Sequence, residues 1–78
     1  MMTYEEFEKR CLKELIRVMP EDWAEDMRGY LKESDSQDVL REFYEMGVKR
    51  YENNKKHDND LAFGYCVSTA VENLRLMY

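Results

Sequence analysis

The only histidine of the chain, His57, is followed by Asp58, and a histidine beside a carboxylate can act as a general base. Such a base works only when a nucleophile is held within hydrogen-bond distance of it. Nothing in the hydrophilic segment around His57 supplies that nucleophile, and one histidine in a loop cannot complete a catalytic triad. We therefore expect no catalytic residue, and the sequence favours a chain that is not an enzyme.

Two other groups of residues could bind metal ions. The Asp-Asn-Asp segment at 58–60 matches the start of a calcium loop, but the sixth and twelfth positions, which need Gly and Glu, hold Phe63 and Thr69. Cys11 and Cys66 have no second Cys or His at zinc-ligand spacing. We therefore expect no metal and no cofactor, a helix cap at 58–60, and two buried thiols whose pairing in a disulfide the spacing leaves open.

Composition is typical of a small globular domain. The chain has 78 residues, of which 44% are hydrophobic and 37% charged, with three Gly and one Pro. This length suits a single domain with a small core. The net charge of −5 argues against nucleic acid as a partner, since domains that bind it usually carry a basic footprint. Neither a signal peptide nor an apolar membrane span is evident, so we expect no membrane contact and a cytoplasmic protein.

Hydrophobic periodicity and helix end signals predict four amphipathic helices, over about 3–19, 20–33, 36–53 and 60–77. Thr3 and Glu6 form a capping-box pattern at the start of the first helix. Glu8 falls inside the apolar arc of that helix, so it should lie at the rim of the packed face or meet a polar partner. Pro20 suits the first position of the second helix, in which Trp23 lies on the apolar arc and is expected in the core.

The polar segment at 34–36 is expected to separate the second and third helices, because each of its residues can cap a helix. Gly47 lies on the apolar face of the third helix, which predicts either a close helix approach or a kink. The fold class is therefore all-α, a small four-helix bundle-like domain with short connections and roughly antiparallel neighbours. A three-helix core with one loosely packed helix is the alternative.

Charge is distributed unevenly along the chain. Residues 21–45 carry nine acids and three bases, a net charge of −6, whereas residues 46–57 carry four bases and one acid, a net charge of +3. Solvated helix faces, with bases that suit a helix dipole, are the simpler interpretation. The functional one is a protein-binding surface, because complementary charge speeds association and enforces specificity. Its candidate residues are Glu21, Asp22, Glu25, Asp26, Lys49, Arg50, Lys55 and Lys56.

Leu61, Tyr65 and Leu76 lie on the far side of the last helix from its main apolar face. They either contact a neighbouring helix or form an oligomer surface, and homodimerisation would enlarge a small core. The function we expect is that of a small acidic protein-interaction module, namely an adaptor, accessory subunit or inhibitor, with phage or mobile-element proteins as an analogy of size and charge. The alternative is a small helical transcriptional regulator or other nucleic-acid-binding protein, although the helix after Pro20 is acidic where a recognition helix is usually basic.

Overall fold

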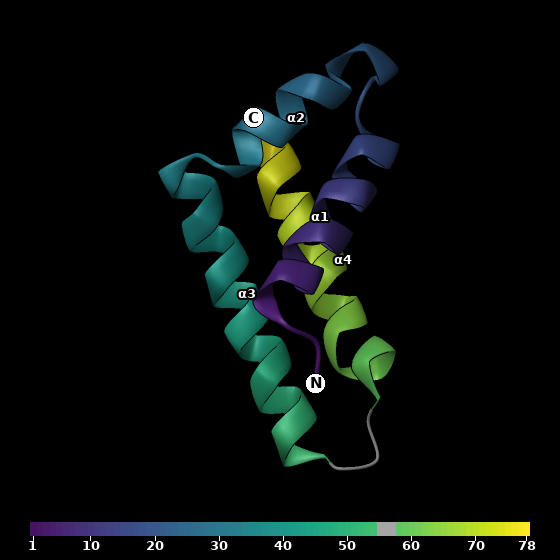
Figure 1. Cartoon of the computed structure of the whole chain (residues 1–78), viewed down its shortest axis with the longest axis vertical. Helices are drawn as coiled ribbons and strands as arrows, with labels where there is room; N and C mark the ends of the chain where they lie inside the picture. Colours follow the sequence, from purple (N-terminus) through teal and green to yellow (C-terminus); the bar gives the residue numbers. More distant parts are fainter. Residues whose placement is uncertain (55–57) are drawn as a thin grey trace.

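The computed structural model describes residues 1–54 and 58–78, and it confirms the predicted all-α class. The helices are α1 (Tyr4–Val18), the short 3₁₀ turn η1 (Glu21–Trp23), α2 (Ala24–Leu31), α3 (Ser34–Asn53) and α4 (Asn59–Met77) (Figure 1). No strand occurs in the part of the chain that the structure describes.

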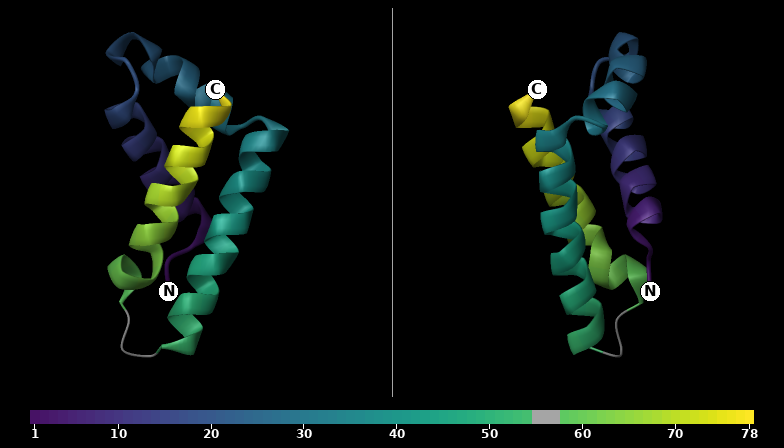
Figure 2. Two further views of the ribbon diagram at one scale, coloured as in Figure 1. Left: turned by 180° about the vertical axis from the view of Figure 1, so that it is seen from behind. Right: turned by 60° about the vertical axis from the view of Figure 1, so that its left-hand side comes forward.

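The arrangement is centred on α4, which packs against both α3 and α1. The helices α3 and α4 run antiparallel side by side, and the left view of Figure 2 shows α2 crossing one end of the bundle towards the last turn of α4. The molecule measures 40 × 22 × 19 Å along its principal axes. The two apolar sides of α4 have different environments. One side is buried in the core, and the other carries Leu61, Tyr65 and Leu76 on the surface.

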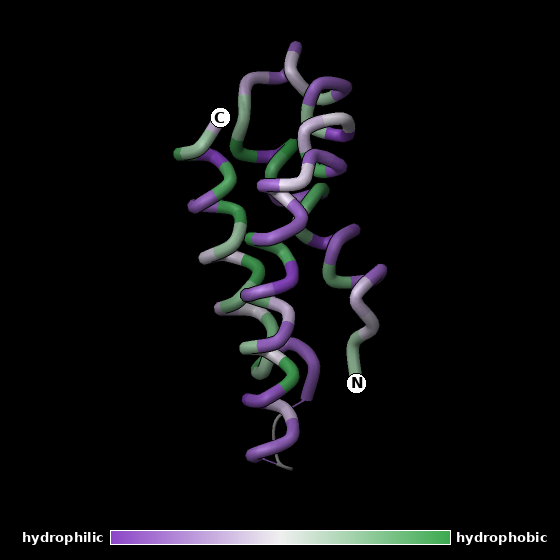
Figure 3. Tube along the Cα trace, turned by 90° about the vertical axis from the view of Figure 1, so that its left-hand side faces the viewer, coloured by the Kyte–Doolittle hydropathy of each residue, from purple (hydrophilic) through white to green (hydrophobic). Residues whose placement is uncertain are grey.

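The core consists of apolar residues from all four α-helices. The hydropathy of each position along the chain is shown on the Cα trace in Figure 3. The fully buried large side chains of the core include Phe7 and Leu15 from α1 and Phe63 and Leu74 from α4. Met2 is also buried, although it precedes the periodic pattern of α1. Its backbone amide donates a hydrogen bond to Asn59 Oδ1 at 2.8 Å, so this segment is held against the start of α4.

Two predicted helix ends are confirmed by hydrogen bonds. The side chain of Thr3 accepts a hydrogen bond from the amide of Glu6 at 3.1 Å, and that of Asp58 accepts one from the amide of Leu61 at 2.9 Å. These caps satisfy amide groups that have no partner within the helix.

Two predicted boundaries were wrong. Residues 34–36 are not a break, because α3 begins at Ser34 and Ser36 is buried in its first turn. The second helix does not run continuously over 20–33, since η1 precedes a shorter α2 that ends at Leu31.

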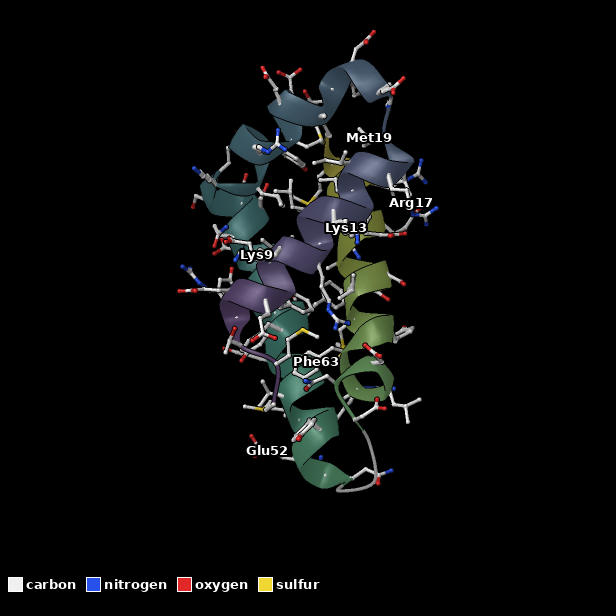
Figure 4. All side chains as sticks on the ribbon, turned by 45° about the vertical axis from the view of Figure 1, so that its right-hand side comes forward. Lys9, Lys13, Arg17, Met19, Glu52 and Phe63 are labelled. Carbon is white, nitrogen blue, oxygen red and sulfur yellow. The ribbon has the colours of Figure 1, made fainter. Side chains whose placement is uncertain are left out.

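Gly47 marks the close approach of α3 to α4. A Cβ atom at this position would lie 2.3 Å from Cδ1 of Phe63, which is closer than carbon atoms can approach without movement. The Phe63 ring lies between the two helices (Figure 4) and is fully buried. The predicted close approach is confirmed, and α3 is continuous through Gly47.

We expect Gly47→Ala to destabilise the fold by about 1–3 kcal/mol, because the added methyl group forces a buried ring to move. Gly64→Ala is the matched control, since its Cβ would meet nothing within 4 Å and alanine favours a helix by up to about 1 kcal/mol. Urea denaturation followed by circular dichroism measures both changes. Equal stability of the two variants would contradict this account of Gly47.

Candidate functional site

The four predicted acidic residues gather at the end of the bundle that η1 and the start of α2 form. Glu21 and Asp22 belong to η1, Glu25 and Asp26 to the first turn of α2, and all four are exposed. None of them makes an ion pair or a side-chain hydrogen bond with another residue of the described chain. Four exposed carboxylates are therefore concentrated at this end of the bundle without an ionic partner among the described residues.

An aromatic cluster lies beside these acids, and it includes a residue that was predicted to be buried. Trp23 is 39% exposed, so its expected place in the core was wrong. Its ring centroid lies 5.4 Å from that of Tyr78, which in turn lies 4.8 Å from that of Tyr30 in an edge-on contact. The Tyr30 hydroxyl donates a hydrogen bond to the carbonyl of Leu74 at 2.7 Å, which anchors the cluster to α4.

We call this surface the acidic tip, and it consists of Glu21, Asp22, Trp23, Glu25, Asp26 and Tyr78. The spacing within 21–26 revealed the acids, but the pairing of Trp23 with Tyr78 joins residues that are far apart in the sequence. Only the fold brings the two rings together.

Two residues of the predicted basic group, Lys49 and Arg50, belong to the C-terminal part of α3, which lies towards the other end of the long axis (Figure 1). Lys49 and Arg50 are exposed there, whereas Lys55, Lys56 and His57 lie outside the described residues. The guanidinium carbon of Arg50 lies 5.5 Å from the ring centroid of Tyr65, within range of a cation–π interaction. Lys49 and Arg50 therefore do not form one surface with the acidic candidates.

The predicted oligomer surface is a row of apolar side chains along the outer face of α4. Leu61, Tyr65 and Leu76 are 58%, 59% and 72% exposed, although the Tyr65 ring also contacts Arg50 of α3. The exposed carboxylate of Glu72 lies among them and pairs with Arg75.

Sequence reasoning missed a hollow between α1 and α2. Its apolar lining includes Leu12, Ile16 and Leu31, and basic side chains border it. Ile16 lies outside the apolar arc of the predicted first helix, and the hollow exists only because α2 folds back beside α1. Both depressions are lined by Lys9 of α1 and Arg28 of α2, and the sequence of one helix alone does not predict that these two bases lie together.

Both cysteines are buried and free, as expected for structural thiols. Burial raises the pKa of the Cys11 thiol to about 12, with smaller contributions from Cys66 and Glu8, and burial also raises the pKa of Cys66. Within the described residues, no group of three or more His, Cys, Asp or Glu side chains could hold a metal ion. None of the helices in the described residues is both long enough and apolar enough to cross a membrane.

No protein-family model, curated protein or solved structure matches this chain.

We expect neither thiol of the folded protein to react with a disulfide reagent at about pH 8, because the thiolate is the reactive form and a raised pKa keeps both groups protonated. Unfolding in urea exposes both thiols and should release two equivalents. Absorbance of the released reagent measures the rates. Rapid labelling of Cys11 without urea would show that this side chain is not buried as described.

Proposed function

We propose that this chain is a non-enzymatic protein-interaction module, acting as an adaptor, accessory subunit or inhibitor, which binds a basic segment of its partner at the acidic tip. The observation that carries the proposal is the exposed contact between Trp23 and Tyr78 beside four carboxylates that no described residue neutralises.

The chemistry of the tip suits lysine and arginine side chains in two ways. The face of an indole or phenol ring attracts a cation, and tryptophan does so most strongly. The carboxylates of Glu21, Asp22, Glu25 and Asp26 add a field that speeds the approach of a basic partner and makes binding sensitive to salt. Aromatic residues also supply a large share of the binding energy at protein interfaces.

The cellular setting is part of the same proposal. Free thiols at Cys11 and Cys66 support a reducing compartment, and we propose the cytoplasm. The proposal assigns no catalytic step to the acidic tip, because its four carboxylates are exposed to solvent.

A titration with a synthetic arginine-rich peptide tests the acidic tip directly, because Trp23 is the only tryptophan and its fluorescence reports on this surface alone. We expect a saturable change in Trp23 emission as the peptide binds. The affinity should fall as the salt concentration rises, because salt screens the attraction between the carboxylates and the peptide. Changing Glu21, Asp22, Glu25 and Asp26 to Lys should weaken binding at least about tenfold.

The matched control reverses four exposed acids on α3, namely Asp35, Asp38, Glu42 and Glu45, and therefore gives the same net charge. This control should keep most of the affinity. If both variants lose affinity equally, the peptide responds only to net charge and the acidic tip is not a binding site.

A second candidate function is homodimerisation through the outer face of α4, favoured by the exposure of its apolar residues. Such a face would bury Leu61, Tyr65 and Leu76 against a second copy and enlarge a small core. It does not involve the acidic tip, so the two functions are compatible.

We expect sedimentation to show a dimer whose dissociation is promoted by Leu61→Ser together with Leu76→Ser, because both exposed side chains lose apolar area at the interface. The substitutions should leave the helical content unchanged, since neither residue lies in the core. A chain that sediments as a monomer up to about 1 mM has no such interface.

A further inference from the structure

The hollow between α1 and α2 is an apolar groove with a basic border. It consists of two adjoining depressions of about 260 and 280 Å³, which share Lys9, Leu12 and Arg28 in their linings. Leu31 lies in the first depression and Ile16 in the second. Its residues are Glu8, Lys9, Leu12, Lys13, Ile16, Arg28, Leu31 and Lys32.

The basic side chains at the border have no ionic partner among the described residues. Lys9, Lys13, Arg28 and Lys32 are exposed, and none of them forms an ion pair with a described residue. By contrast, Arg10, Arg17 and Arg75 each pair with a carboxylate.

The only acid that lines the groove is already engaged. Gln37 donates a hydrogen bond from Nε2 to Oε2 of Glu8 at 2.7 Å, which confirms that Glu8 meets a polar partner. Four exposed cations therefore face a single hydrogen-bonded carboxylate, and the groove is locally positive in a chain whose net charge is −5.

We propose that this groove binds an acidic amphipathic helix of a partner protein. Leu12 and Ile16 lie one helical turn apart on α1, as do Lys9 and Lys13, so apolar and basic contacts repeat along the groove with the same spacing as the side chains of a helix. Figure 4 shows Lys9, Lys13 and Arg17 following one another along α1. A helix that lays its apolar face in a groove and its acids against basic borders is an established mode of recognition.

Charge and shape favour an acidic helix in this groove over an anionic bilayer or a second copy of the chain. Proteins bind an anionic bilayer by inserting protruding apolar side chains into it. Leu12 and Ile16 do not protrude, because they are half-buried beside longer basic side chains, so the groove suits an apolar side chain that enters from a partner. The acidic tip of a second copy carries an exposed Trp23, but that ring already packs on Tyr78 and would have to leave it to enter the groove. The inference is independent of the proposed function, because it concerns a different surface and a partner of opposite charge.

The test uses the full chain and a synthetic helical peptide with leucines one turn apart on one face and glutamates beside them. Backbone amide shifts in the NMR spectrum should move saturably for residues of the groove, and not for Trp23 or Tyr65. A control peptide with serine in place of leucine tests the apolar contacts, and one with lysine in place of glutamate tests the charge.

Charge-reversal variants decide where the peptide binds. Lys9→Glu with Lys13→Glu should weaken binding at least about tenfold, because attraction becomes repulsion at the border of the groove. Lys49→Glu with Arg50→Glu makes the same change of net charge near the C-terminal end of α3, away from the groove. This variant should keep an affinity within about twofold of the original. Circular dichroism verifies that both variants remain folded, which is expected because all four residues are exposed.

Four outcomes would overturn the proposal. The first is no saturable shift up to about 1 mM peptide, and the second is an equal loss of affinity in both variants. The third is binding to vesicles that contain phosphatidylserine without binding to the peptide, which would assign the groove to a membrane surface. The fourth is a shift of groove residues with protein concentration alone, which would assign it to a second copy. Failure of the arginine-rich peptide at the acidic tip bears on none of these results.

Discussion

The absence of a side chain at Gly47 determines how closely α3 and α4 can approach. The ring of Phe63 occupies that space, stacks on the ring of Tyr44, and also lies against Phe7 of α1. Tyr44 in turn donates a hydrogen bond from its hydroxyl to the carbonyl of Met2. One close contact between two helices therefore helps to fix where α1 begins, and the surfaces that α1 borders depend on that position.

The helices could be predicted because each combines an apolar period with local end signals. Thr3 and Asp58 cap their helices through side-chain contacts with neighbouring residues, and such contacts are visible in the sequence. The start of α3 could not be predicted in this way, because serine and aspartate suit both a cap and a first helical turn. The choice between them depends on how α3 packs against the rest of the fold, where Ser36 is buried, and packing is a tertiary property.

The surface features also differ in how far the sequence predicts them. Acids at 21–26 are clustered in the sequence, so their position was predictable, but the exposure of Trp23 was not. The expected arc assumed 3.6 residues per turn from Pro20 onward, whereas η1 is a 3₁₀ turn with about three. Trp23 ends η1 with a φ of −98° and a ψ of 4°, so the arc of a continuous α-helix does not apply to its side chain, which lies beside Tyr78. The groove, likewise, depends on where α2 lies beside α1, which no periodicity in a single helix can reveal.

Net charge is a poor guide to recognition in this molecule because its charges are segregated in space. Three arginines are neutralised by carboxylates of Glu14, Asp60 and Glu72, while the four acids of the tip and the four bases at the groove have no ionic partner in the described chain. A partner responds to the field within about 8–10 Å of the surface it approaches, since salt screens more distant charges. An excess of five negative charges over the whole chain therefore does not prevent an acidic helix from being attracted to the α1–α2 groove.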